Sequence, residues 1–157
     1  MSRYTIISIS LIKGGAAMIQ LIVGAKGKGK TKHLLEKVNN AVKTVDGNIV
    51  YLDKNSKHMY ELKNKIRLIN TSEFPFSSTD EFIGFVCGIV SQDHDLQEVY
   101  LDSFMDVAFI KDKGAIEGVL DRFDHISSQF AVDFIISISL EVAEVPEKFK
   151  SNVIVAL

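Results

Sequence analysis

Short apolar runs alternate along this chain with longer segments in which apolar residues recur every three or four positions. The apolar runs cover residues 19–23, 49–53, 66–69, 98–102, 132–139 and 153–157. The segments with helical spacing cover residues 31–45, 82–90 and 116–126. Runs without polar alternation are typical of strands that are buried on both faces. The pattern therefore predicts an α/β protein with three α/β/α layers, in which helices cover both faces of a mainly parallel sheet.

Local signals define several boundaries between these elements. Ser78-Thr79-Asp80-Glu81 has the capping-box pattern and predicts the start of the helix that follows. Gly47 is expected to end the first helix. Residues 56–62 are predicted to form a short helix, and residues 146–149 a helical turn. The sequence has no repeat, low-complexity tract or linker, so residues 18–157 are predicted to form one domain.

Composition limits the classes of function open to the chain. Of its 157 residues, 46% are hydrophobic and 24% are charged, which is ordinary for a globular domain with a buried core. The formal net charge of −2 gives no overall attraction to nucleic acid or to an anionic membrane surface. A single cysteine, Cys87, excludes an internal disulfide and favours a reducing compartment. We therefore expect a cytoplasmic protein, and nucleic acid is not indicated as a partner.

The N-terminal residues 1–17 need a separate interpretation. Residues 4–12 are apolar but too few to span a bilayer, so no membrane span is predicted. Lys13-Gly14-Gly15 can be encoded by a sequence that reads as a bacterial ribosome-binding site, and it lies just upstream of Met18. We therefore interpret residues 1–17 as a translated leader before a natural start at Met18. If they belong to the protein, we expect them to form an extra edge strand.

The segment between the first predicted strand and the first predicted helix carries the most specific motif of the chain. Gly24-Ala25-Lys26-Gly27-Lys28-Gly29-Lys30-Thr31 matches G-x-x-x-x-G-K-[ST] at every defined position. In such a strand–loop–helix unit, backbone N–H groups and the positive end of the helix dipole face one anion. The motif therefore predicts a nucleotide-binding loop. The predicted binding residues are Gly24, Ala25, Lys26, Gly27, Lys28, Gly29, Lys30, Thr31 and Lys32.

Individual positions of this loop have predicted roles. Gly24 and Gly29 allow backbone conformations with positive φ and leave room for the phosphate. The ammonium group of Lys30 is expected to reach the β- and γ-phosphates, and the Thr31 hydroxyl to bind Mg²⁺. The other loop lysines either add charge near the phosphates or are solvated on the outer surface of the loop. The predicted cofactors are ATP and Mg²⁺. The sequence lacks the N/T-K-x-D tetrapeptide that reads guanine, which favours ATP over GTP.

A second partner for the magnesium ion is expected from an acid that ends a buried strand, the Walker B acid. Asp102 fits best, because it follows the apolar residues 99–101, and Asp53 is the alternative. Some ATPases insert a strand between the loop strand and the Walker B strand, and that strand follows Walker B in the sequence. The apolar residues 134–138 fit this order and end near hydroxyls, where such enzymes carry a polar sensor of the γ-phosphate. Asp53 would then end the neighbouring strand, either as a catalytic acid that orients water or as a solvated residue.

In these features the chain resembles the P-loop NTPase superfamily and, within it, the RecA-like ATPases. The resemblance covers residues 18–157 and implies the P-loop NTPase fold. The chain also resembles small stand-alone bacterial ATP-binding proteins that are often labelled as twitching-motility ATPases, but it lacks the His- and Asp-containing boxes of a pilus retraction motor. Ala25 stands where the partition and nitrogenase-reductase class carries a second lysine, which disfavours that class.

One departure from the RecA-like pattern bears on activity. Ser103 directly follows the predicted Walker B acid, where this pattern usually has a catalytic glutamate. Hydrolysis is therefore expected to be slow, or stimulated by a partner, unless Asp53 or Asp106 orients the water. The same departure favours an alternative, a nucleotide-dependent binding module or switch with little turnover.

A third hypothesis is a small-molecule kinase, which would use the same loop. Kinases of this size generally carry an arginine-rich lid, whereas this chain has only Arg3, Arg67 and Arg122. Arg122 is either a surface charge or an arginine finger that acts in trans in a homo-oligomer. The expected partners are a nucleotide and, for a stimulated ATPase, another protein or a second copy of the chain.

Overall fold

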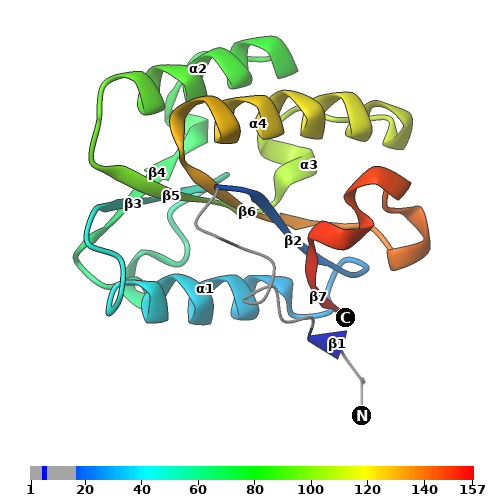
Figure 1. Cartoon of the computed structure of the whole chain (residues 1–157), viewed down its shortest axis with the longest axis horizontal. Helices are drawn as coiled ribbons and strands as arrows, with labels where there is room; N and C mark the ends of the chain where they lie inside the picture. The colour runs from blue at the N-terminus through cyan, green and yellow to red at the C-terminus, as the bar shows by residue number, and fades with distance from the viewer. Residues whose placement is uncertain (1–4, 7–16) are drawn as a thin grey trace.

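A seven-stranded sheet forms the middle layer of the protein, and helices cover both of its faces (Figure 1). This computed structural model describes residues 5–6 and 17–157. The strands are β1 (Thr5–Ile6), β2 (Ile19–Val23), β3 (Asn48–Asp53), β4 (Ile66–Asn70), β5 (Leu96–Leu101), β6 (Asp133–Ile138) and β7 (Val153–Ala156). The α-helices are α1 (Lys30–Ala41), α2 (Thr79–Ser91), α3 (Phe104–Val107) and α4 (Ile116–Phe130). The 3₁₀ turns are η1 (Met59–Glu61), η2 (Thr71–Glu73), η3 (Lys113–Ala115), η4 (Val142–Glu144) and η5 (Glu147–Asn152). The predicted three-layer α/β/α architecture is confirmed.

The order of the strands brings four carboxyl ends together. The order is β1-β7-β2-β6-β5-β3-β4, and only the β1–β7 pair is antiparallel among the described strands. β6 lies between β2 and β5 although it follows both in the sequence, which confirms the inserted strand that the sequence predicts. The carboxyl ends of β2, β6, β5 and β3 therefore meet at one edge of the sheet, where open α/β sheets bind ligands.

The two faces of the sheet have different cores. On the face covered by α1, Leu34 and Val38 belong to one cluster with two buried tyrosines, Tyr51 and Tyr100. Helices α2, α3 and α4 lie on the opposite face (Figure 1). The core on that face contains four buried phenylalanines, Phe82, Phe104, Phe123 and Phe134. Because side chains alternate between the faces of a strand, residues two positions after each buried tyrosine return to the α1 face.

The first helix is shorter than its sequence predicts. α1 ends at Ala41 rather than Val45, and the backbone then tightens, with the N–H groups of Thr44 and Val45 both donating to the Ala41 carbonyl. Val42, Thr44 and Val45 are β-branched, which lowers their preference for a helix. Gly47 does not end this helix, contrary to the prediction, because it lies beyond the turn that follows α1 and directly before β3.

Other predictions differ from the structure at the ends of the elements. The predicted helix at 56–62 is only the turn η1, and α3 directly after β5 was not predicted. In the N-terminal segment, Thr5 and Ile6 pair with β7 at the sheet edge. The rest of the leader hypothesis concerns residues 1–4 and 7–16, which lie outside the described residues. Among the residues that the structure does describe, none of the helices has the length and apolar character needed to cross a membrane.

We predict that Gly47 is required for the close approach of two chain segments. A Cβ atom at residue 47 would lie 2.2 Å from the Asp95 carbonyl oxygen, which is backbone and resists displacement. The Gly47→Ala variant should therefore lose about 2 kcal/mol of unfolding free energy, measured by urea denaturation. Gly88→Ala is the matched control, because a Cβ there meets nothing within 4 Å and lies within α2. This control should gain about 0.5 kcal/mol from helix propensity, and equal losses in both variants would contradict the prediction.

Candidate functional site

The loop between β2 and α1 carries the predicted phosphate-binding motif. Gly24 follows β2 with φ of 155°, and Gly29 precedes α1 with φ of 93°, so both adopt backbone conformations that favour glycine. A Cβ atom at residue 24 would lie 3.0 Å from the Cβ of Leu157 and 3.1 Å from its carbonyl oxygen. Space at Gly24 is therefore limited by residue 157 of the chain itself, in addition to the room that a phosphate would need.

Lys30 is the buried cation of this loop. Lys30 is the first residue of α1 and is only 8% exposed. Lys30 Nζ donates to the Ala25 carbonyl oxygen at 3.0 Å, which holds the ammonium group against the loop. Burial lowers the pKa of Lys30, and the negative charges of Asp102 and Glu141 partly oppose that shift. Two carboxylates from other parts of the chain therefore help to keep this buried ammonium charged.

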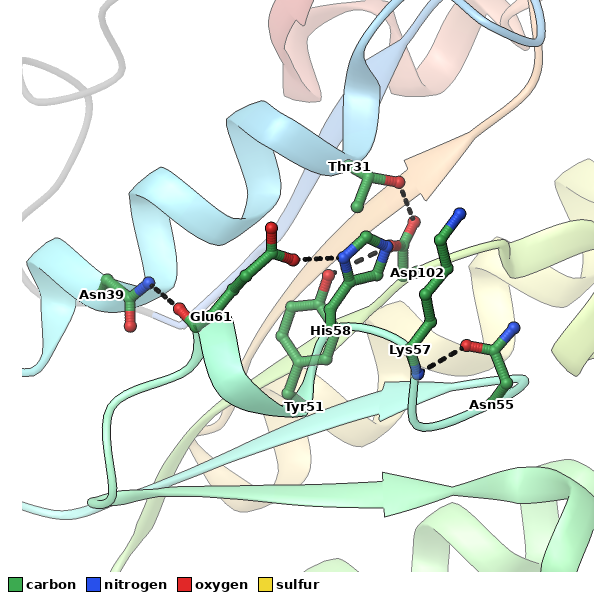
Figure 2. Close-up of polar contacts among 8 residues, drawn as sticks. All are labelled: Thr31, Asn39, Tyr51, Asn55, Lys57, His58, Glu61 and Asp102. Carbon is green, nitrogen blue, oxygen red and sulfur yellow. Dashed lines mark hydrogen bonds and ion pairs between the residues drawn. The ribbon is translucent and has the colours of Figure 1, made fainter.

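Thr31 and Asp102 meet across the space between α1 and the end of β5. The Thr31 hydroxyl donates to Asp102 Oδ1 at 3.3 Å (Figure 2). Asp102 is 3% exposed, and the backbone N–H of Ser103 donates to the same Oδ1 at 2.9 Å. The second oxygen, Oδ2, accepts a 3.0 Å hydrogen bond from the hydroxyl of Tyr51 on β3. Every donor to this buried carboxylate comes from a different element or turn at the same sheet edge.

Asp53 ends β3, the strand next to β5, and is also buried. Its Oδ1 accepts the backbone N–H of Lys54 at 2.7 Å. Burial, followed by the negative charge of Asp102, raises the pKa of Asp53 to about 6, against weaker opposing effects of that hydrogen bond, His58 and Lys54. A carboxyl with a pKa in this range exchanges protons near neutral pH, which is a property of a general base.

The segment after β3 packs along α1, and hydrogen bonds join it to the last turn of that helix. Asn39 of α1 donates to the Glu61 carbonyl oxygen at 2.8 Å, and its own oxygen accepts the Lys63 N–H at 3.0 Å. Figure 2 shows His58 and Glu61 paired on this segment, on the same side as Thr31. A groove of about 680 Å³ lies here between the two elements. Its lining residues are Thr31, Lys32, Leu35, Glu36, Asn39, Asn40, His58, Glu61 and Lys63.

The other charged residues that the sequence predicts for the site are exposed to solvent. Lys26, Lys28 and Lys32 are exposed, which fits solvated side chains around the loop. Asp106 is exposed on α3 and forms a 2.9 Å ion pair with Lys54.

The hydroxyls expected to sense the γ-phosphate and the candidate arginine finger lie on different elements, at the end of β6 and on α4. Ser137 is buried on β6, where it pairs with Ile22 of β2, and Ser139 is exposed just beyond the strand. Arg122 on α4 forms a 2.6 Å ion pair with Asp80 on α2.

The sequence analysis missed two side chains at this centre, Tyr51 and Glu141. Strand alternation could have identified Tyr51, because it lies two positions before Asp53 and therefore shares its face of β3. Glu141 lies after β6 in an irregular segment, where no periodic pattern indicates a direction.

The oxygen donors of the site suit a magnesium ion better than a transition metal. Thr31 and Asp102 offer a hydroxyl and a carboxylate within 3.3 Å of one another. Mg²⁺ commonly binds one or two protein oxygens and completes its shell with water and phosphate oxygens. In residues 5–6 and 17–157, no group of three or more His, Cys, Asp or Glu side chains is placed to hold a metal ion. The residues present therefore fit Mg²⁺ bound together with a phosphate ligand.

Comparison with solved structures supports the fold assignment. The chain is similar to the crystal structure of a KaiC-like protein from the hyperthermophilic archaeon Pyrococcus horikoshii OT3. The TM-score is 0.55 at 16% sequence identity, and the match covers 80% of this chain and 70% of the archaeal chain. No protein-family model matches the sequence, and no curated protein matches it. The likeness shows that the two chains share this α/β fold, in agreement with the fold class that the sequence predicts.

We predict that Asp53 destabilises the ligand-free protein above its pKa. Since its pKa is near 3.8 when solvated and about 6 in the fold, the unfolded chain loses the proton first as the pH rises. The stability of the wild type should therefore fall between pH 4 and 6 relative to Asp53→Asn, which has no proton to lose. The advantage of Asp53→Asn should be about 2 kcal/mol larger at pH 8 than at pH 4.5, measured by urea denaturation.

The exposed Asp46 provides the matched control for this experiment. Water solvates its carboxylate in both the folded and the unfolded chain, so Asp46→Asn should show a difference of under about 0.5 kcal/mol at either pH. A constant difference between Asp53→Asn and the wild type from pH 4.5 to 8 would contradict the prediction.

Proposed function

We propose that this protein binds Mg·ATP through residues 24–32 and Asp102 and hydrolyses it slowly or on stimulation by a partner. The observation that carries the proposal is the meeting of Thr31 with Asp102 at 3.3 Å, directly beside the buried Lys30. A strand–loop–helix unit with this motif presents backbone N–H groups, a lysine and a hydroxyl to one phosphate chain. The fold that the chain shares with a KaiC-like protein supports the same class of ligand.

Each residue of the proposed site has a defined part in this proposal. On nucleotide binding, Lys30 Nζ would leave the Ala25 carbonyl oxygen and donate to phosphate oxygens instead. The Thr31 hydroxyl and the Asp102 carboxylate would hold Mg²⁺, which neutralises phosphate charge when bound. The loop N–H groups orient the phosphates, and the buried position of Lys30 excludes water from its ammonium group.

Asp53 is the residue that we assign to orient the attacking water. It is buried at the end of the strand next to Asp102, and its raised pKa suits a proton acceptor. Ser103 does not supply a carboxylate, and its backbone adopts φ of 52° while its N–H group serves Asp102. The proposed chemistry therefore depends on one acid on the neighbouring strand, which is consistent with slow turnover.

The main alternative is a nucleotide switch with little turnover, and the observation that favours it is the serine at position 103. A small-molecule kinase is less well supported by the described residues. Arg122 is engaged by Asp80, and Arg67 lies on the edge strand β4, so neither is part of an arginine-rich lid. The resemblance to small bacterial ATP-binding proteins stays a prediction from the sequence.

We predict that Lys30→Ala weakens binding of Mg·ATP by at least about 100-fold, measured by isothermal titration calorimetry. The substitution removes the buried cation expected to contact the β- and γ-phosphates, an interaction of about 3 kcal/mol or more. Lys43→Ala is the matched control, because Lys43 is an exposed lysine just beyond the other end of α1. The control should bind as the wild type does. Unchanged affinity of a folded Lys30→Ala variant would refute the proposed site.

A second prediction separates hydrolysis from binding. Asp53→Asn should lower phosphate release from ATP by at least about 100-fold, because the amide is a poor proton acceptor. Binding of Mg·ATP should change less than about threefold, since Asp53 is not assigned to the metal or phosphates. If the wild type binds Mg·ATP without releasing phosphate, the switch is the correct function. ADP formation that requires an added nucleoside or metabolite, with the phosphoryl group recovered on that acceptor and not as free phosphate, would instead indicate a kinase.

A further inference from the structure

Tyr51 is a buried polar residue that the proposed mechanism has not yet used. It lies in the middle of the core on the α1 face and is 0% exposed. Its hydroxyl donates to Asp102 Oδ2 at 3.0 Å, and Figure 2 shows this bond beside the one from Thr31. Burying a hydroxyl costs free energy unless it is hydrogen-bonded, so phenylalanine would be the simpler core residue at this position.

The carboxylate of Asp102 has a donor on each oxygen. Oδ1 accepts from the Thr31 hydroxyl and the Ser103 N–H, while Oδ2 accepts from Tyr51. Rotation of an aspartate carboxylate about its last bond is otherwise broad and roughly two-fold. With donors on both sides, Oδ1 is directed toward Thr31, where the metal is expected, and Oδ2 toward the core.

We propose that Tyr51 is a positioning residue that orients the Asp102 carboxylate for magnesium and thereby sets how strongly Mg²⁺ enhances ATP binding. This inference rests on the function proposed above. A neutral hydroxyl orients the carboxylate without cancelling its charge, whereas a lysine or arginine in this place would form an ion pair and weaken the attraction for Mg²⁺. Burial, together with the charge of Asp102, raises the pKa of Tyr51 far above its ordinary value, so the hydroxyl keeps its proton and remains a donor.

Tyr100 provides a matched comparison within the same core. It is also 0% exposed, pairs with Tyr51 in register on β5, and stacks on it with ring centroids 6.3 Å apart. Its hydroxyl likewise donates to a carboxylate, Glu98 Oε1 at 2.6 Å, but Glu98 lies near the start of β5, opposite the loop end. Replacing either tyrosine with phenylalanine therefore changes the same pair of stacked rings. Only the replacement of Tyr51 removes a hydrogen bond to Asp102.

The test is calorimetric titration of ATP into the wild type, Tyr51→Phe and Tyr100→Phe, each in excess Mg²⁺ and in EDTA. The ratio of the two affinities measures the enhancement by magnesium without requiring turnover. Tyr51→Phe should lower this ratio about tenfold, the size expected for one hydrogen bond to a charged group, and leave the affinity in EDTA within about twofold. Tyr100→Phe should keep the wild-type ratio. Thermal unfolding verifies that both variants are folded.

A double-mutant cycle with Asp102→Asn gives the second measurement. Once the carboxylate is replaced, Tyr51→Phe should produce no further loss of the magnesium enhancement. Equal ratios for the wild type and Tyr51→Phe, equal losses in both phenylalanine variants, or an undiminished effect in the Asp102→Asn background would each overturn the inference while leaving the proposed function intact. A wild type that gains no ATP affinity from magnesium would overturn both.

Discussion

The parallel pairing of β6 with both β2 and β5 fixes the distance on which the whole site depends. A single inserted strand separates the strand that delivers the loop from the strand that delivers Asp102. Neighbouring strands lie roughly 5 Å apart, so the start of α1 and the end of β5 stand about two strand spacings apart. Side chains of the size of threonine and aspartate bridge that remaining gap, as the 3.3 Å contact of Thr31 with Asp102 demonstrates. Slippage of either pair would turn these side chains away from the shared face.

Two acids and one lysine are buried together at this edge of the sheet. Asp53 and Asp102 are each 3% exposed, and Lys30 is the buried cation beside them. Burial, followed by the charge of Asp102, raises the pKa of Asp53, and the same charge partly opposes the lowering of the Lys30 pKa by burial. A protein under selection for stability alone would not bury two carboxylates in this way. The proposed ligand would bring a cation to Asp102 and an anion to Lys30, while Asp53 would remain available for water.

The sequence predicted the elements that follow from periodicity and missed those that follow from packing. Continuous apolar runs identified the six parallel strands, and their order in the chain identified β6 as the inserted strand. Gly47 shows the limit of such reasoning, because its role depends on a carbonyl oxygen almost fifty residues later in the chain. Tyr51 shows another limit, since an aromatic residue in an apolar run is indistinguishable from core until its partner is known. Glu141 acts on Lys30 from an irregular segment that carries no periodic signal.

The two faces of the sheet differ in the residues of their cores, and this difference bears on where the buried acids of the site lie. The core under α2, α3 and α4 contains phenylalanine rings, and Phe123 packs edge to face with both Phe104 and Phe134. No tyrosine belongs to the described hydrophobic cluster on this face. The α1 face has two tyrosines, and their hydroxyls donate to Glu98 on β5 and to Asp102 directly after it. Alternation places Asp53 and Asp102 on this second face, where the hydroxyls of Thr31 and Tyr51 donate to the buried carboxylate of Asp102. The site therefore depends on the loop between β2 and α1 and also on a polar side chain, Tyr51, in the core on the α1 face.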